Sequence, residues 1–411
     1  MKELELYLHI PFCERKCAYC DFLSAPADLP VRISYIKKLQ EEIVYYGAQY
    51  GEYQVSSIFF GGGTPTILEG YQLAAILETV KEHFNITTDA EITVECNPGT
   101  LTAGKAEKLV QAGFNRLSMG LQSADDRELH LLGRIHNFAQ FLESYDLARK
   151  AGFRNINVDL MSALPGQTLK SWQDTLQKVT ALRPEHISAY SLIIEEGTPF
   201  YERFAEDERI REEGGHPRLL PEEDVERQMY ELTETFLHTK GYERYEISNY
   251  AKPGYECRHN CGYWTRKDYL GLGLGASSLV EHQRFQNTSE LKTYLEQEYS
   301  PQCEGQHERR IEETIQLQEE TGLTQTGHHI HIETLDKKSE MEEFMFLGLR
   351  LMAGISRQQF EKNFQVTLNS VYGEVLRKLK GEQLIEEVAG YVRLTEHGID
   401  VSNYVLAEFL L

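Results

Sequence analysis

Strand-like and helix-like segments alternate along the first half of the chain, and this alternation constrains the fold more than any other feature. Short apolar or alternating runs predict strands within residues 4–9, 57–60, 91–95, 116–120, 155–160 and 186–194. Helical spacing of apolar residues predicts helices at 31–50, 69–84, 102–112, 125–132, 138–150 and 169–182. Six βα units in succession imply a parallel sheet, which is either an incomplete barrel or a doubly wound sheet.

Unusual polar, glycine and cysteine residues come at or just after the ends of these strands. They are the cysteine loop after the first strand, Gly61–Gly63 after the second, Glu95, Gln122 and Asp159. In a βα barrel, the carboxyl ends of the strands carry the active site. We therefore expect these residues to surround one site at that edge of the sheet.

The loop after the first strand contains three cysteines, Cys13, Cys17 and Cys20. Thiolates are soft ligands that favour iron–sulfur clusters, zinc and copper(I). A structural zinc site takes four ligands, and Phe22, two residues after the last cysteine, cannot ligate. Three free cysteines and a disulfide are the alternatives, although three such close cysteines suit a disulfide poorly. The spacing favours a metal site with one open coordination position.

Three further features near the strand ends each allow a purely structural and a functional interpretation. Gly61–Gly63 is either a tight turn or a place where a ligand approaches backbone amides. Glu95 is either a solvated carboxylate or an acceptor for a polar ligand group. Asp159 lies between Val158 and Leu160 in an apolar strand, so its carboxylate needs a partner if it is buried.

A second block, from Cys257 to Trp264, is dense in His, Cys and aromatic residues and contains His259 and Cys261. It is either a loop with core aromatics or a site for a planar aromatic ligand, because aromatic rings stack on flat apolar surfaces. His and Cys also ligate heme iron. Zinc is a further interpretation, although no fourth ligand is evident nearby.

The formal net charge of −22 argues against a nucleic-acid backbone or an anionic membrane surface as the partner. No apolar run approaches the ~18–20 residues of a membrane span, and the start of the chain does not resemble a signal peptide. Seven cysteines, an odd count with three clustered, suit a reducing cytoplasm.

The chain is expected to have four parts: a barrel core at 1–195, a barrel extension at 196–290, an acidic linker at 291–340 and a small helix–helix–hairpin module at 341–411. The acidic stretch 206–226 is predicted to be a flexible, solvated insertion. In the linker, the run His-Ile-His-Ile predicts a strand, and metal or heme binding there is a minority interpretation. That interpretation rests on Cys303, His307, His328, His329 and His331.

The cysteine spacing, with Tyr19 before the last cysteine, resembles the signature of the radical S-adenosylmethionine (SAM) superfamily. The segments 9–13, 61–66, 95–99 and 164–168 resemble its oxygen-independent coproporphyrinogen III oxidase-like branch. This resemblance implies a partial (β/α)6 barrel with a C-terminal winged-helix-like module, and a [4Fe–4S] cluster on Cys13, Cys17 and Cys20. By the same resemblance, the SAM contacts are Tyr7, Tyr19, Gly62, Gly63, Thr64, Glu95, Gln122, Arg134 and Asp159.

Within this branch, the chain resembles heme chaperones more than the oxidase. The oxidase has a further cysteine at the position of Phe22, and an extension before a first strand that only three residues precede here. The stretch His259–Trp264 is typical of the chaperones and is linked to heme binding there, although Ser277 stands where that family usually has His. The resemblance implies a cytoplasmic protein with heme, a heme-accepting protein and an electron donor as partners, and transient contact with membrane heme proteins. Two alternatives stay open: the oxidase itself, and a radical SAM enzyme with another substrate.

Overall fold

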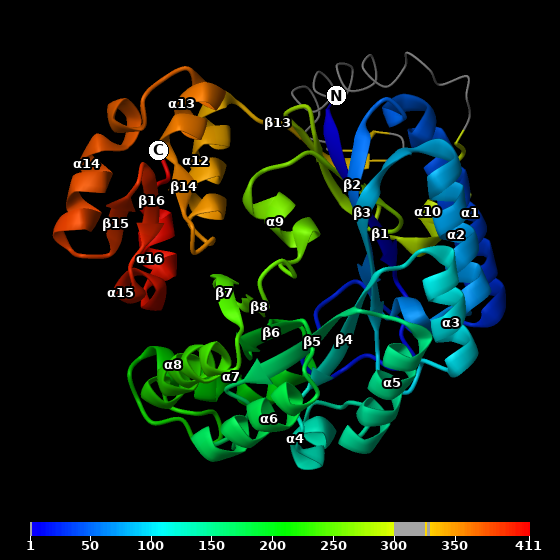
Figure 1. Ribbon diagram of the computed structural model, residues 1–411, viewed down its shortest axis with the longest axis horizontal. Helices are drawn as coiled ribbons and strands as arrows, with labels where there is room; N and C mark the ends of the chain where they lie inside the picture. The colour runs from blue at the N-terminus through cyan, green and yellow to red at the C-terminus, as the bar shows by residue number, and fades with distance from the viewer. Residues whose placement is uncertain (1, 300–324, 327–328) are drawn as a thin grey trace.

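Six parallel strands form the centre of the molecule, and they lie side by side in the order in which they occur in the chain (Figure 1). The computed structural model describes residues 2–299, 325–326 and 329–411. The strands are β1 (Glu3–Ile10), β2 (Gln54–Gly62), β3 (Asn85–Cys96), β4 (Arg116–Gln122), β5 (Asn155–Ser162) and β6 (His186–Ser191). A doubly wound sheet would reverse its strand order at a switch point. The sequential order therefore confirms the partial barrel.

Helices cover the outer face of these strands (Figure 1). They are α1 (Leu29–Tyr50), α2 (Gly70–His83), α3 (Ala103–Ala112), α4 (Asp126–Leu131), α5 (Phe138–Ala151) and α6 (Leu169–Ala181), with a short 3₁₀ turn, η1, at Pro65–Ile67. Several begin at a side-chain cap, as when Asp28 accepts from the Val31 N–H. Along β1, Leu4, Leu6 and Leu8 belong to the apolar core, while the alternate residues face the barrel interior.

Later segments lengthen the sheet at both edges, so that the described residues form a sheet of 13 strands. β9 (Tyr269–Leu272) pairs in parallel with β1, and β8 (Asn249–Ala251) pairs antiparallel with β6. The remaining strands are β7 (Glu243–Glu246), β10 (Ser277–Val280), β11 (Gln283–Asn287), β12 (Gln325–Thr326) and β13 (His329–Thr334). The run His-Ile-His-Ile lies in β13, so the strand predicted for it is confirmed. Cys303, His307 and His328 lie outside the described residues.

The acidic stretch 206–226 was expected to be a flexible insertion, and this expectation is wrong for its first part. Helix α7 (Pro199–Glu212) extends through it, and α8 (Glu223–Thr239) begins near its end. Thr198 caps α7, and Phe200 and Phe204, one turn apart, are buried in an apolar cluster. The charged residues pair with one another along the helix, as Arg209 does with Glu206.

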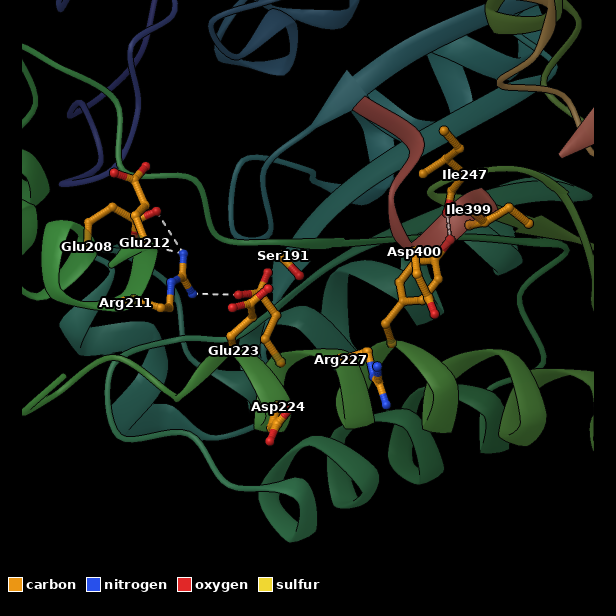
Figure 2. A pocket seen from close by; sticks show the side chains of 12 residues that line it. Ser191, Glu208, Arg211, Glu212, Glu223, Asp224, Arg227, Ile247, Ile399 and Asp400 are labelled. Carbon is orange, nitrogen blue, oxygen red and sulfur yellow. Dashed lines mark hydrogen bonds and ion pairs between the residues drawn. The ribbon is translucent and has the colours of Figure 1, made fainter. Parts of the chain in front are cut away.

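The last part of the chain is a small α+β unit with its own apolar core, which confirms the predicted helix–helix–hairpin order. Its elements are α12 (Lys337–Gly348), β14 (Ile355–Ser356), α13 (Arg357–Phe364), α14 (Leu368–Gly381), β15 (Ile385–Val388), β16 (Tyr391–Leu394), α15 (Glu396–Asp400) and α16 (Ser402–Ala407). Where α15 approaches α8, a cavity of about 520 Å³ is lined mainly by charged side chains (Figure 2). Arg211 in this cavity pairs with Glu208 and Glu226.

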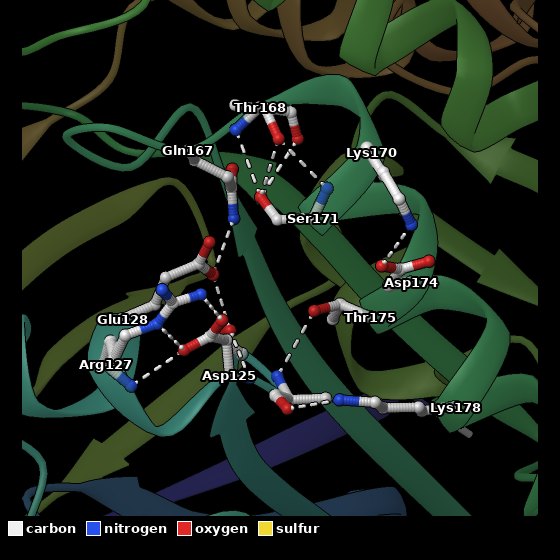
Figure 3. Close-up of polar contacts among 12 residues, drawn as sticks. Asp125, Arg127, Glu128, Gln167, Thr168, Lys170, Ser171, Asp174, Thr175 and Lys178 are labelled. Carbon is white, nitrogen blue, oxygen red and sulfur yellow. Dashed lines mark hydrogen bonds and ion pairs between the residues drawn. The ribbon is translucent and has the colours of Figure 1, made fainter.

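A buried carboxylate fixes the loops that follow β4 and β5. Glu128 accepts hydrogen bonds from the Ser123 hydroxyl at 2.6 Å and from Gln167 Nε2 at 2.9 Å (Figure 3). The segment that leads from β4 to Arg134 is therefore tied to the turn after β5. Among the described residues, no helix combines the length and the apolar character that crossing a membrane requires.

Candidate cofactor site

A cavity of about 280 Å³ lies where the carboxyl ends of β1 to β6 meet. It brings together 11 of the 13 residues that the sequence singled out. They are Cys13, Cys17, Cys20, Tyr19, Gly62, Gly63, Thr64, Glu95, Gln122, Arg134 and Asp159. Only Tyr7 and His259 are outside its lining. The predicted convergence on one edge of the sheet is therefore confirmed as geometry, while the contacts of these residues with a cofactor stay predictions.

The cysteine loop forms one wall of the cavity. Cys13 is buried, Cys17 and Cys20 are partly exposed, and all cysteines among the described residues are free. No three His, Cys, Asp or Glu side chains in the described ranges converge on a single-ion site. A cubane cluster distributes its thiolate ligands over separate irons, so three separate thiols fit it better than they fit zinc.

A fourth cysteine at the cavity, Cys96, does not extend this set of ligands. Its sulfur donates to the Asn97 carbonyl oxygen at 3.5 Å, and burial raises the pKa of its thiol to about 11. The Cys96 thiol is thus directed at the backbone of its own strand end, and a set of three cysteine ligands with one open position stays a prediction.

Glycines allow the loop after β2 to pass close to the cysteine loop. Gly62 has a φ of 109°, a conformation that L side chains rarely adopt. A Cβ at Gly63 would lie 2.6 Å from the Phe12 carbonyl oxygen. The Gly63 N–H donates to the Ile10 carbonyl at 2.9 Å, and the Thr64 N–H donates to the Phe12 carbonyl at 2.7 Å. The turn interpretation is therefore confirmed, while the approach of a ligand to these backbone amides stays a prediction.

Two partly buried carboxyl groups line the cavity. Glu95 Oε2 accepts from the Gly62 N–H at 3.2 Å, and Asp159 Oδ1 accepts from Asn157 Nδ2 at 2.6 Å. Burial, aided by the negative charge of Asp159, raises the pKa of Glu95 to about 8. Burial also raises the pKa of Asp159. A cationic ligand would favour ionisation of both groups, so this part of the cavity suits a positive charge.

Arg134 joins the cysteine loop to the neighbouring strand ends. Its guanidinium donates from Nη1 to Cys17 Sγ at 3.5 Å and from Nη2 to Asn97 Oδ1 at 2.7 Å and the Gly120 carbonyl at 2.6 Å. Asn97 in turn donates to Thr64 Oγ1 at 2.8 Å. Arg134 therefore fixes a cation beside Cys17 and ties the cysteine loop to the ends of β3 and β4.

The sequence did not single out several residues that line the cavity, including Asn97, Ser118 and Tyr190. Tyr190 donates its hydroxyl to Gln122 Oε1 at 3.1 Å. Gln122 has a φ of 74° at an irregular point of the β4–β5 pairing, so its backbone departs from regular strand geometry at the cavity. The two-residue alternation along β4 was an available signal for Ser118, because it shares a face with Gln122.

Tyr7 and His259 lie deeper in the barrel than the cavity. The Tyr7 hydroxyl is 3.1 Å from His9 Nδ1, and its ring stacks on Phe59. His259 is 1% exposed, with Nδ1 at 2.8 Å from the Ser57 hydroxyl and Nε2 at 3.0 Å from the Tyr263 hydroxyl. Both ring nitrogens of His259 are therefore engaged, and heme ligation by this residue stays a prediction that the geometry does not favour.

Helix α9 (Arg258–Trp264) holds His259 against Ser57 and Phe59 on β2. Glu91 on β3 accepts from the backbone N–H groups of Arg258 and His259 at 3.2 and 3.3 Å. A Cβ at Gly262 would lie 2.1 Å from the Glu5 carboxylate, so the helix packs closely on β1. α9 therefore fills the end of the barrel opposite the cavity.

Comparison with known proteins gives matches over the whole chain. A radical SAM superfamily model matches residues 7–179, and a HemN C-terminal domain model matches residues 335–401. The chain is 34% identical to a heme chaperone HemW of Lactococcus lactis, covering 98% of this chain and 97% of that protein. It is 35% identical to a heme chaperone HemW of Bacillus subtilis, covering 98% of each chain.

A mitochondrial protein of Mus musculus, radical S-adenosyl methionine domain-containing protein 1, is 34% identical over 98% of this chain and 87% of its own. Among solved structures, coproporphyrinogen III oxidase (HemN) from Escherichia coli aligns with a TM-score of 0.77 and 24% identity. That alignment covers 100% of this chain and 90% of the oxidase. At this identity, the likeness to the oxidase shows the fold alone.

Proposed function

Because this chain belongs to the radical SAM superfamily and is homologous over its full length to heme chaperone HemW, we propose that it is a heme chaperone. In this proposal, it holds a [4Fe–4S] cluster on Cys13, Cys17 and Cys20, and binds SAM in the adjoining cavity. It also binds heme and transfers it to an acceptor protein in the cytoplasm, with transient contact where that acceptor is a membrane heme protein. An electron donor for the cluster is a further partner.

The observation that carries the proposal is the composition of the cavity walls. Three free thiols lie on one side, and the carboxyl groups of Glu95 and Asp159 lie among the other lining residues. When bound, the cluster supplies one-electron chemistry and an iron that no protein thiolate occupies. SAM carries a positive sulfonium group, which suits a cavity with two partly buried carboxyl groups.

The chain's own groups have distinct tasks in this proposal. Arg134 holds Cys17 in place for the cluster, and the glycines at 62 and 63 allow the loop after β2 to pack closely on His9 and Phe12 beside the cavity. Glu95 and Asp159 accept hydrogen bonds from the polar groups of SAM. The aromatic rings of Tyr19 and Phe200, with centroids 6.3 Å apart, keep water from one side of the loop.

The heme part of the proposal rests on the names of the relatives, because His259 in the segment that resembles heme chaperones is buried and both of its ring nitrogens are engaged. An exposed aromatic residue, Phe22, and two basic residues, Arg15 and Lys16, line the same cavity as the cysteines. Heme is apolar across its ring and carries two carboxylates, so these side chains are compatible with it.

Anaerobic cluster reconstitution followed by SAM and heme titrations tests the proposal. The wild-type chain should contain iron and sulfide in the proportions of a [4Fe–4S] cluster, bind SAM, and shift the Soret band of added heme. The variant Cys13→Ala, Cys17→Ala, Cys20→Ala should contain neither iron nor sulfide, while Cys96→Ala, the matched control, should keep both. Incubation with coproporphyrinogen III, SAM and a reductant should form no protoporphyrinogen; its formation would favour the oxidase instead.

A further inference from the structure

A chain of hydrogen bonds crosses the barrel interior, starting at the cavity. Asp159 Oδ1 accepts from Asn157 Nδ2 at 2.6 Å, and Asn157 Oδ1 lies 2.6 Å from His186 Nδ1. His186 Nε2 then lies 2.8 Å from the hydroxyl of Tyr245 on β7. Asn157 and Asp159 are two residues apart on β5 and share the interior face, and Asn157 pairs with His186 on β6.

The chain of hydrogen bonds has one consistent direction. The Asn157 amide points its NH₂ group at Asp159 and at the Ser118 hydroxyl, 2.8 Å away, so its oxygen is left to accept from His186 and, at 3.2 Å, from the Ser188 hydroxyl. His186 therefore donates from Nδ1, and its Nε2 accepts from Tyr245. His186 is fully buried, and burial lowers the pKa of its imidazole well below the ordinary value, as a neutral ring requires.

We propose that His186 is a positioning residue for the cofactor cavity, acting through Asn157 on the carboxylate of Asp159. Neither His186 nor Asn157 lines the cavity, so His186 acts without touching a ligand. Without His186, Asn157 Oδ1 keeps only the longer hydrogen bond from the Ser188 hydroxyl, at 3.2 Å against 2.6 Å for His186. An Asn amide that is held less firmly can rotate and point its oxygen at Asp159, which would repel the carboxylate and release it from its position. This inference rests on the proposed function, namely that SAM binds beside Asp159.

Equilibrium dialysis of SAM against the cluster-reconstituted full-length chain, without oxygen, tests the inference. His186→Leu should bind SAM on the order of tenfold more weakly, because hydrogen bonds that orient a charged group are among the stronger ones. His186→Asn should stay within roughly threefold of wild type, since its amide nitrogen can replace the Nδ1 donor. The control is the iron and sulfide content of each variant: if it equals that of wild type, the cysteine loop is intact.

A second pair of variants keeps the test decisive if His186→Leu does not fold. Tyr245→Phe removes the hydroxyl that holds Nε2, and should weaken SAM binding by about threefold. Tyr242→Phe removes the hydroxyl of a buried tyrosine that instead donates to the Pro184 carbonyl at 2.7 Å, and it should bind SAM as wild type does.

Three outcomes would overturn the inference: wild-type affinity in His186→Leu, equal weakening in His186→Asn and His186→Leu, or equal affinity in Tyr245→Phe and Tyr242→Phe. Failure of the reconstituted wild-type chain to bind SAM would instead overturn the proposed function. The two failures are therefore distinguishable, because only the second is visible in the wild-type protein.

Discussion

At the scale of single residues, Glu95 should couple SAM binding to proton release. Its pKa is raised to about 8 by burial and by the charge of Asp159, so it is mostly protonated at pH 7. A cationic ligand favours the carboxylate, so binding at pH 7 should release roughly one proton from this group, and affinity should rise from pH 6 to 8. Calorimetry in two buffers of different ionisation enthalpy counts the released protons.

The matched variant for this experiment is Glu95→Gln, which keeps the shape and removes the titration. Protons that come from SAM itself are common to both proteins, so the difference between them reports Glu95. The difference should be close to one proton at pH 7 and should vanish above pH 9. An equal proton count in both proteins would show that Glu95 is already ionised in the free chain.

Residue-scale predictions from the sequence succeeded where a residue was unusual for its surroundings. The clustered cysteines, the run of three glycines and Asp159 in an apolar strand each depart from the local pattern, and the structure places the three cysteines, Gly62, Gly63 and Asp159 at the cavity. Asn97 and Tyr190 are ordinary for their positions and were not singled out. His259 was singled out because the block around it is rich in His, Cys and aromatic residues. That composition does not indicate how deeply α9 packs.

At the scale of elements, α7 protects the cysteine loop. Phe200 and Phe204 pack with Leu132 and against Tyr19, and the Phe200 N–H donates to the Ala18 carbonyl at 2.9 Å. Phe200→Ala should lower the free energy of unfolding by about 3–5 kcal/mol and open the loop to oxygen. Phe141→Ala removes an equally buried ring far from the loop and should cost similar stability. Only Phe200→Ala should shorten the lifetime of the cluster absorbance in air; equal lifetimes would contradict this role of α7.

The second element-scale prediction concerns α9. His259→Ala removes two hydrogen bonds and a buried ring, so we expect a loss of about 2–4 kcal/mol in the free energy of unfolding in urea. Heme affinity of the folded variant should stay near that of wild type, because the imidazole has no free nitrogen. His216→Ala, at an exposed histidine, should change neither quantity. Lost heme affinity at unchanged stability would instead place the heme at α9.

Helices and strands of the first half were predictable because their apolar periodicity is strong and their caps are local. Helix α3, for example, was expected at 102–112 and is found at Ala103–Ala112, between the cap Thr102 and Gly113 in the left-handed conformation. Helix α7 was missed because its charged residues dominate the composition. Its two buried phenylalanines, four residues apart, were the available signal.

At the scale of the whole molecule, the pairing of strands far apart in the chain could not be predicted from the sequence. The strand that pairs with the free edge of β1 is β9, which is only four residues long and follows it by more than two hundred residues. Short strands of this kind have little periodicity, and their position is decided by the partner edge rather than by local preference. The same applies to the place where the C-terminal unit docks.

The docking of that unit depends on a carboxylate that bridges it to the rest of the chain. Glu343 on α12 is 6% exposed and accepts from Arg266 Nε at 3.0 Å and from Arg284 Nη2 at 2.6 Å. Glu343→Gln removes the charge and leaves two arginines without it, which should weaken docking by about 3 kcal/mol. Glu386→Gln, whose partner Arg393 is well exposed, should cost at most about 1 kcal/mol.

The two tryptophans of the chain allow this docking to be observed directly. Trp172 is fully buried in the barrel core, whereas Trp264 lies under the Arg350 guanidinium, 4.4 Å from its ring centroid. In a Trp172→Phe background, Trp264 fluorescence reports separation of the C-terminal unit as urea increases. Glu343→Gln should shift that transition to lower urea, while circular dichroism of the barrel changes later. A single transition at the wild-type urea concentration would show that Arg266 and Arg284 do not hold the two parts together.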